Sequence, residues 1–134
     1  MSATNYLENA VLDHLVGNSV LTGGVIYIAL ATAVADAELG TFTEVSESGT
    51  GYVRQQAAAG DWATSSGGTV TTSGNIQFPV ATAGYGTVTH VVLTDSATYG
   101  GGNVWLIQAL TTPKTVDADD QFVINNSNLS ISLD

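Results

Sequence analysis

The hydrophobic positions near the N-terminus follow a helical period. In "TNYLENAVLDHLVGN", Leu7, Val11 and Leu15 recur at every fourth position, which places them on one helix face. Asn5 fits an N-cap position with Glu8 three residues later, as in a capping box, and Gly17 fits a C-terminal stop. The pattern predicts one short amphipathic helix over about residues 5–16. It does not decide whether the apolar face packs on its own core or on a partner.

From residue 25 onward the apolar positions follow strand patterns. The run "VIYIALAT" at residues 25–32 is β-branched and aromatic, and Leu129, Ile131 and Leu133 alternate with serines. Further strands are predicted at residues 52–59, 75–78, 86–96, 103–111 and 121–124. Pro79 ends one of them or places it at a sheet edge. Between the strands we expect an exposed loop at residues 35–51, a turn-rich connection at residues 60–69 and a last turn at residues 112–120.

Short strands separated by turn signals predict the fold class. The chain is expected to be mainly β, forming an antiparallel β-sandwich or a small barrel with one N-terminal amphipathic helix. Its 134 residues suit a single domain, 1–134, with the helix at about 5–16 and the β-sandwich at about 25–134. A domain of this size can bury a core without a disulfide or a metal.

Charge restricts the possible partners. The net charge is −10, and Arg54 and Lys114 are the only cations, which argues against nucleic acid and anionic membranes as ligands. No apolar run reaches the roughly 20 residues that a membrane span needs. Charged residues make up 10% of the chain, against roughly 25% in an average soluble domain. The small hydroxyl, alanine and glycine side chains that replace them can be buried against neighbours at low entropy cost.

The cluster Asp117, Asp119 and Asp120 is the first candidate for a metal site. A calcium loop of the EF-hand type that began at Asp117 would need glycine at its sixth position and glutamate at its twelfth. Phe122 and Asn128 occupy those positions, so the pattern fails. The cluster is interpreted as a solvated turn whose aspartates accept hydrogen bonds from backbone amides.

Other catalytic and cofactor patterns are missing from the sequence. The chain has no cysteine, and its two histidines, His14 and His90, are interpreted as structural. No serine stands in a G-x-S-x-G motif, and no glycine run has the spacing of a phosphate loop. We therefore expect no catalytic residue, no cofactor, no metal and no enzymatic activity.

The aromatic residues and the two cations are the candidates for interface residues. Trp62, Trp105, Tyr52, Tyr85 and Tyr99 either form a sugar-stacking platform or serve singly as core and interface anchors. With so few cations, Arg54 and Lys114 are each expected to meet a carboxylate within the chain or across a subunit boundary. Arg54 is interpreted as an interface or buried anchor and Lys114 as a turn residue of the final hairpin. The predicted interface set is Tyr6, Leu7, Arg54, Tyr85 and Lys114.

The order of the sequence segments carries a resemblance to a known family. The segments are "NYLENAVLDHL", then "GYVRQ", then "FPVATAGYGTVTH" and "ALTTPKTV". Together they resemble small virion proteins of tailed bacteriophages, often labelled tail fibre or decoration proteins, over nearly the whole chain. That family often has a glycine-aspartate turn before the last strands, and Ala118-Asp119-Asp120 replaces it here. The family has no known catalytic residues to carry over.

The resemblance implies a non-enzymatic structural role in a phage virion that is assembled in the cytoplasm of the bacterial host. The implied partners are the major capsid protein or tail proteins of the same phage, and further copies of the chain, with a trimer favoured. Compactness and acidity favour a capsid decoration, or cement, protein on the outer head, away from DNA. The alternatives are a tail, baseplate or fibre-associated module and a carbohydrate- or receptor-binding module.

Overall fold

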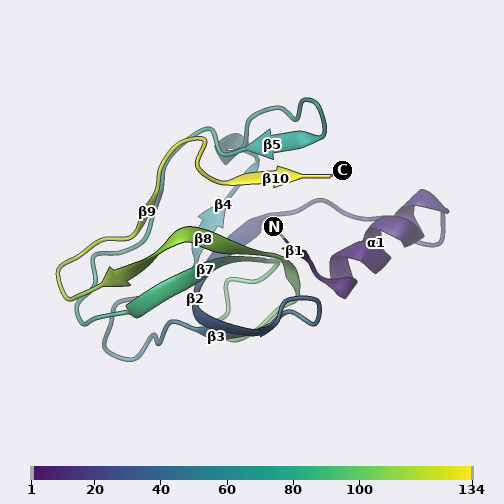
Figure 1. Cartoon of the computed structure of the whole chain (residues 1–134). Helices are drawn as coiled ribbons and strands as arrows, with labels where there is room; N and C mark the ends of the chain where they lie inside the picture. The colour runs from purple at the N-terminus through teal and green to yellow at the C-terminus, as the bar shows by residue number, and fades with distance from the viewer. Residues whose placement is uncertain (1, 134) are drawn as a thin grey trace.

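Two layers of antiparallel strands form the body of the protein, and one helix projects from its side (Figure 1). The computed structural model describes residues 2–133. The larger layer is a six-stranded sheet of order β1-β8-β7-β2-β3, in which β4 also pairs with β2. Its strands are β1 (Ser2–Ala3), β2 (Ile26–Asp36), β3 (Thr41–Glu44), β4 (Gln55–Ala57), β7 (Gly86–Thr94) and β8 (Val104–Val116).

The second layer consists of two small sheets. In one, β5 (Thr69–Thr71) pairs with β10 (Ser130–Ser132), and in the other β6 (Ile76–Gln77) pairs with β9 (Val123–Ile124). A short 3-10 helix, η1 (Ala59–Asp61), follows β4. This arrangement confirms the predicted antiparallel sandwich, whereas the barrel alternative is wrong because the large sheet stays open, ending at β1 and at β3 and β4.

The main core lies between the layers. Ile28 and Leu30 of β2 and Leu93 of β7 are completely buried and belong to one cluster with Phe78 and Phe122 of the second layer. Ala29, Ala31 and Val92 on the opposite face of the sheet are also fully buried, in a second cluster. Burial on both faces explains why the sequence of β2 is a continuous apolar run and not an alternating one.

The helix α1 (Asn5–Leu15) follows the predicted range, with one correction at its start. Thr4, not Asn5, is the N-cap: its Oγ1 accepts a hydrogen bond of 3.3 Å from the backbone N–H of Leu7. The predicted stop at Gly17 is confirmed. Gly17 has a φ of 81° and donates to the His14 carbonyl, while Asn18 donates to the Asp13 carbonyl, which is the Schellman arrangement.

Three predicted loops contain strands. Residues 41–44 form β3 inside the expected loop at residues 35–51, and residues 69–71 form β5 at the end of the turn-rich connection. The strand β8 continues through the expected turn at residues 112–120 as far as Val116. It does so through a large bulge, because residues 110–113 separate Ala109 from Lys114 where the partner strand has Thr89 alone.

Candidate functional site

The N-terminal end of α1 is fixed to the edge of the large sheet. The buried Thr4 donates from Oγ1 to the Val104 carbonyl at 2.5 Å and from its backbone N–H to the Trp105 carbonyl at 3.1 Å. The backbone N–H of Asn5 donates to the Glu38 carbonyl at 2.8 Å. These bonds tie the first turn of the helix to β8 and to the loop between β2 and β3, and they set the direction in which the helix leaves the body.

Tyr6 and Leu7, two of the predicted interface residues, lie in this first turn. The Tyr6 ring is 5.0 Å from the Trp105 ring, tilted by 57°, and Tyr6 remains 45% exposed. Leu7 is half-buried and packs against the core cluster. Tyr6 therefore offers an accessible aromatic surface, while Leu7 faces its own domain.

An apolar groove separates α1 from the C-terminal strand. Its volume is about 760 Å³. Its lining includes Leu7 and Val11 of α1, Trp105 of β8, and Val25, Ile131 and Leu133. Of the described residues that line it, Asp95 is the one with a charge. The groove is thus an accessible apolar hollow on the side of the molecule from which the helix projects.

Arg54 is a buried anchor within the chain. Its Nε donates to Glu44 Oε1 at 2.7 Å and its Nη2 donates to Glu44 Oε2 at 2.9 Å, with side chains 2% and 5% exposed. Its Nη1 donates to Thr94 Oγ1 and to the carbonyls of Ser96 and Gly101. Arg54 therefore fixes the loop between β7 and β8 to β3, and its side chain is fully used inside the domain.

Arg54, Glu44 and Tyr52 form a polar cluster in which the charges of Arg54 and Glu44 stabilise each other. Burial by itself raises the pKa of Glu44. The Glu44 carboxylate also accepts hydrogen bonds from Arg54, the Gly100 N–H and Tyr52, and it lies beside the charge of Arg54. Together these contacts bring the pKa of Glu44 below its ordinary value. Burial raises the pKa of Tyr52 far above its ordinary value, and the neighbouring Glu44 raises it further. The Tyr52 hydroxyl donates to Glu44 Oε1 and accepts from the Leu30 N–H. The cluster holds one carboxylate, one guanidinium and one neutral phenol.

Of the aromatic residues considered either for a sugar-stacking platform or as core and interface anchors, Tyr52 and Tyr85 are core residues. Tyr52 and Tyr85 are 2% and 5% exposed, and their rings meet edge to face at 5.7 Å inside the core. The Tyr85 hydroxyl donates to the Pro79 carbonyl at 2.8 Å. Tyr99 covers the edge of Tyr52. Tyr52 and Tyr85 act as core anchors, whereas Tyr99 is 40% exposed. Tyr85, proposed from the sequence as an interface residue, is enclosed by its own chain.

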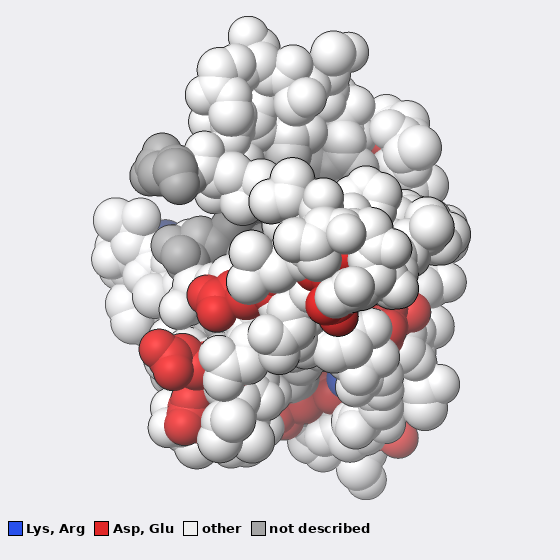
Figure 2. Space-filling model, turned by 90° about the vertical axis from the view of Figure 1, so that its right-hand side faces the viewer, with Lys and Arg blue, Asp and Glu red and all other residues white. Residues whose placement is uncertain are grey.

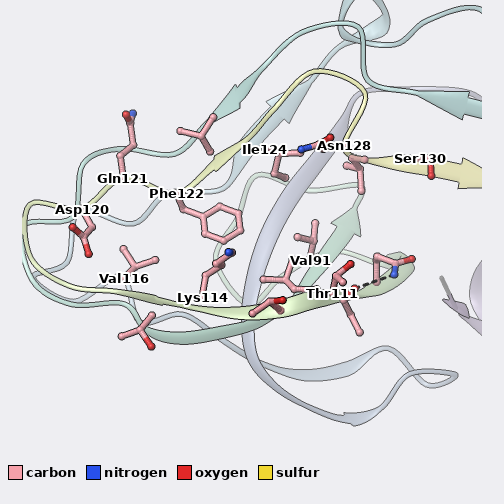
Figure 3. Close-up of a pocket in the computed structure, with 17 residues that line it drawn as sticks. Val91, Thr111, Lys114, Val116, Asp120, Gln121, Phe122, Ile124, Asn128 and Ser130 are labelled. Carbon is pink, nitrogen blue, oxygen red and sulfur yellow. Dashed lines mark hydrogen bonds between the residues drawn. The ribbon is translucent and has the colours of Figure 1, made fainter.

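Lys114 lies in β8, opposite Val88, so its assignment to a turn is wrong. Figure 3 shows its side chain directed into a cleft of about 800 Å³ between β8 and the segment that carries Phe122 and Ile124. No carboxylate of residues 2–133 forms a salt bridge with Lys114, so a carboxylate partner across a subunit boundary stays a prediction. The second half of β8 extends past the short strand β1 and has an open edge. A proline (Pro113), a lysine (Lys114) and a bulge in this segment discourage pairing with a foreign strand.

The remaining polar candidates have local roles. Asp120 accepts a hydrogen bond of 3.0 Å at Oδ2 from the Asp117 N–H, which confirms that the aspartate cluster caps a turn. His14 Nδ1 accepts from the Leu21 N–H at 3.3 Å, and His90 Nδ1 lies 2.8 Å from Thr89 Oγ1. Over residues 2–133, no three histidine, aspartate or glutamate side chains gather in a way that could hold a metal ion.

The exposure of the end of α1 was not predicted from the sequence. Leu12, Leu15 and Val16 are 58%, 77% and 68% exposed, and no residue of α1 is buried. One signal was available: Leu12 and Val16 lie outside the stripe formed by Leu7, Val11 and Leu15. A helix with apolar residues beyond its core-facing stripe has a second surface to cover.

These features describe a β-sandwich protein with exposed apolar side chains on its projecting helix and an apolar groove beside it. The chain belongs to the family described as podophage GP4 fiber I protein gp80, whose model matches residues 2–132. It is therefore a structural protein of the phage virion. No curated protein sequence matches the chain. In the part of the chain that the structure describes, the helices are too short or too polar to cross a membrane.

Proposed function

We propose that this protein is a non-enzymatic, fibre-associated structural module of the phage tail, present in several copies and in contact with other tail proteins. The family description, fiber I protein, supports this function over the capsid decoration that acidity and compactness suggested. The single observation that carries the proposal is the match over residues 2–132, because it covers the sandwich and the projecting helix together.

The distribution of side chains supports a scaffolding role. The most elaborate polar cluster, built around Arg54 and Glu44, is buried and joins segments of the same chain. The accessible features are apolar surfaces around α1 and an acidic exterior. Figure 2 looks at the molecule from the side on which α1 projects, where red acidic groups cover part of the lower half and almost no blue is visible. Such a surface suits contact with protein and disfavours contact with DNA.

Reconstruction of the intact phage by cryo-electron microscopy tests the proposal. The coordinates should fit density in the fibres or at their attachment to the tail, in a small number of copies. Density that repeats over the head lattice would overturn the fibre assignment and restore the decoration hypothesis. Quantitative mass spectrometry of purified virions provides an independent measure, because a decoration protein is present in far more copies than a tail component.

A further inference from the structure

Lys114 is the one exposed lysine or arginine side chain of this acidic protein. The sequence holds two such cations, and the other, Arg54, is buried in its pair with Glu44. Lys114 lies opposite Val88 in the β7–β8 register and two residues before Val116, so the three side chains share the face of the sheet that is turned toward the second layer. Val88 and Val116 are buried there, whereas Lys114 is exposed. A single positive charge therefore lies at the open margin of the inner face.

The cleft that receives Lys114 has two walls from different parts of the chain. One wall is formed by residues of β8 within 108–116, and the other by residues 120–124 together with residues 128–130. Figure 3 shows the Lys114 ammonium group between the walls, with Asp120 at one end of the cleft and residues 128–130 at the other. The volume of about 800 Å³ lies within the range of pockets that hold a small organic ligand.

The polar lining of the cleft consists mainly of amide and hydroxyl groups. Gln108, Thr111, Thr112, Gln121, Asn128 and Ser130 contribute them. The amide nitrogens of the two glutamines donate to the carbonyls of Ala109 and Phe78. Within residues 2–133, the side chains of the other four and of Lys114 form no hydrogen bond. Asp120 accepts from the Asp117 N–H at Oδ2, which leaves Oδ1 to accept from a ligand. The cleft thus offers one ammonium group together with several neutral donors and acceptors.

We infer that this cleft binds a saccharide that carries one carboxylate, such as a uronic acid, with the carboxylate on Lys114. An ammonium group recognises a carboxylate through charge-assisted hydrogen bonds. The amides, the hydroxyls and the Asp120 carboxylate donate to and accept from the hydroxyl groups of a sugar. The ligand carries one negative charge and not several, because the net charge of −10 and the presence of Asp120 in the cleft oppose a polyanion.

Other classes of ligand match this lining less well. An extended peptide would add a strand to the open edge of β8, but Pro113 has no N–H to donate and the bulge interrupts the ladder. An apolar ligand would remove water from the ammonium and hydroxyl groups without replacing their hydrogen bonds. A neutral sugar would leave Lys114 without a counter-charge. A sugar with one carboxylate satisfies the charge and the neutral polar groups together.

Lys114 is the only lysine in the sequence, which permits a direct test. Reductive methylation with carbon-13 formaldehyde retains the positive charge and gives one labelled side-chain signal in the NMR spectrum, besides that of the α-amino group. The probe is the disaccharide glucuronosyl-glucose. Cellobiose, in which a hydroxymethyl group replaces the carboxylate, is the neutral control. The acidic disaccharide should shift the Lys114 signal saturably, with a Kd of about 1 mM, and cellobiose should bind about tenfold more weakly.

Variants separate the local ion pair from the overall charge. Binding is followed by backbone amide shifts in the unmodified protein. Lys114→Met should weaken binding of the acidic disaccharide about tenfold and leave binding of cellobiose unchanged. Gln56→Glu, at an exposed residue of β4 outside the cleft, gives the chain the same net charge as Lys114→Met and should bind as wild type. Lys114→Arg retains the charge and should retain most of the affinity. Circular dichroism confirms that each variant is folded.

Several outcomes would overturn the inference. The absence of a saturable shift with the acidic disaccharide is one, equal binding of the two disaccharides is another, and an equal loss of affinity in Lys114→Met and Gln56→Glu is a third. If a blocked peptide with a central glutamate binds and the disaccharide does not, the cleft belongs to a protein partner. If Lys114→Met self-associates and the wild-type protein binds neither disaccharide, Lys114 only protects the sheet edge.

The inference goes beyond the proposed structural role and does not depend on it. Saccharide binding is measured on the isolated chain, whereas the position in the virion is measured on the intact phage. A protein that lies in the fibres but binds no acidic disaccharide would leave the fibre role standing and overturn the saccharide site. A protein that binds the disaccharide but lies on the head would do the reverse.

Discussion

Arg54 and Glu44 form a two-point ion pair, with Nε and Nη2 of the arginine donating to the two carboxylate oxygens at 2.7 and 2.9 Å. Both side chains are at most 5% exposed. The same guanidinium binds two carbonyls of the loop between β7 and β8, and the same carboxylate accepts from the Gly100 N–H at 3.0 Å. The pair therefore joins β3, the residue before β4 and that loop at one end of the sandwich.

Removing one member of the pair should be strongly destabilising. Arg54→Met leaves a buried carboxylate without its counter-ion and removes one donor from each of the Ser96 and Gly101 carbonyls, of which Ser96 keeps the Thr94 hydroxyl. We expect a loss of about 3–5 kcal/mol in the free energy of unfolding. The double variant Arg54→Met/Glu44→Gln should lose less, because no charge remains buried. Urea unfolding followed by tryptophan fluorescence measures both. Equal stability of wild type and Arg54→Met would show that the pair does not stabilise the fold.

The lowered pKa of Glu44 predicts a loss of stability in acid. The unfolded chain takes up a proton at Glu44 near the ordinary pKa of 4.5, whereas the folded protein does so only at lower pH. Over that interval the unfolded state binds more protons, so the free energy of unfolding falls as the pH falls. Unfolding measured from pH 7 to pH 3 should show a shallower fall for Glu44→Gln than for wild type. Parallel pH profiles would contradict the prediction.

Two glycines of the loop between β7 and β8 provide a matched test of crowding. Gly100 and Gly102 both have positive φ, 66° and 80°, but only at Gly102 would an added Cβ collide, at 2.4 Å from Ser96 Cβ. Gly100→Ala should cost about 1–2 kcal/mol from backbone strain, and Gly102→Ala a further ~1–3 kcal/mol from overpacking. Thermal unfolding ranks the variants, and equal melting temperatures would show that the loop moves aside freely.

Local patterns predicted those parts of the fold that depend on neighbours in sequence. The spacing of Leu7, Val11 and Leu15 sets the helix, and Gly17 sets its end, because both features act within one or two turns. Residues 110–113 show the opposite case. Their threonines and Pro113 are typical of a turn, but β7 holds the following residues in register and the extra length becomes a bulge.

The sequence predicted that Arg54 would pair with a carboxylate, but it did not predict which carboxylate. The partner is Glu44 because β3 and β4 both pair with β2, which brings Glu44 at the end of β3 close to Arg54 just before β4. The exposure of Leu15 was not predictable, because it follows from bonds between Thr4 and β8, about a hundred residues away. Helical spacing defines a face, whereas the tertiary contact decides how much of it is covered.

The attachment of α1 through Thr4 gives a last prediction. Thr4→Val retains the shape of the buried side chain but removes the hydroxyl that donates to the Val104 carbonyl and accepts from the Leu7 N–H. Loss of an N-cap costs about 0.5–2 kcal/mol, and here the carbonyl of Val104 also loses a donor. Because α1 has no buried residue, we expect the cost to appear as local opening of the helix.

Amide hydrogen exchange measures that opening. Protection in α1 should fall in Thr4→Val, while the amides of β7 in the core keep theirs. Thr4→Ser retains the hydroxyl and should behave as wild type, and Thr22→Val, at an exposed residue of the following segment, controls for the change of side chain. Unchanged protection in α1 would mean that Thr4 does not hold the helix. A fall in protection throughout the sheet would mean that the helix and the sandwich unfold as one unit.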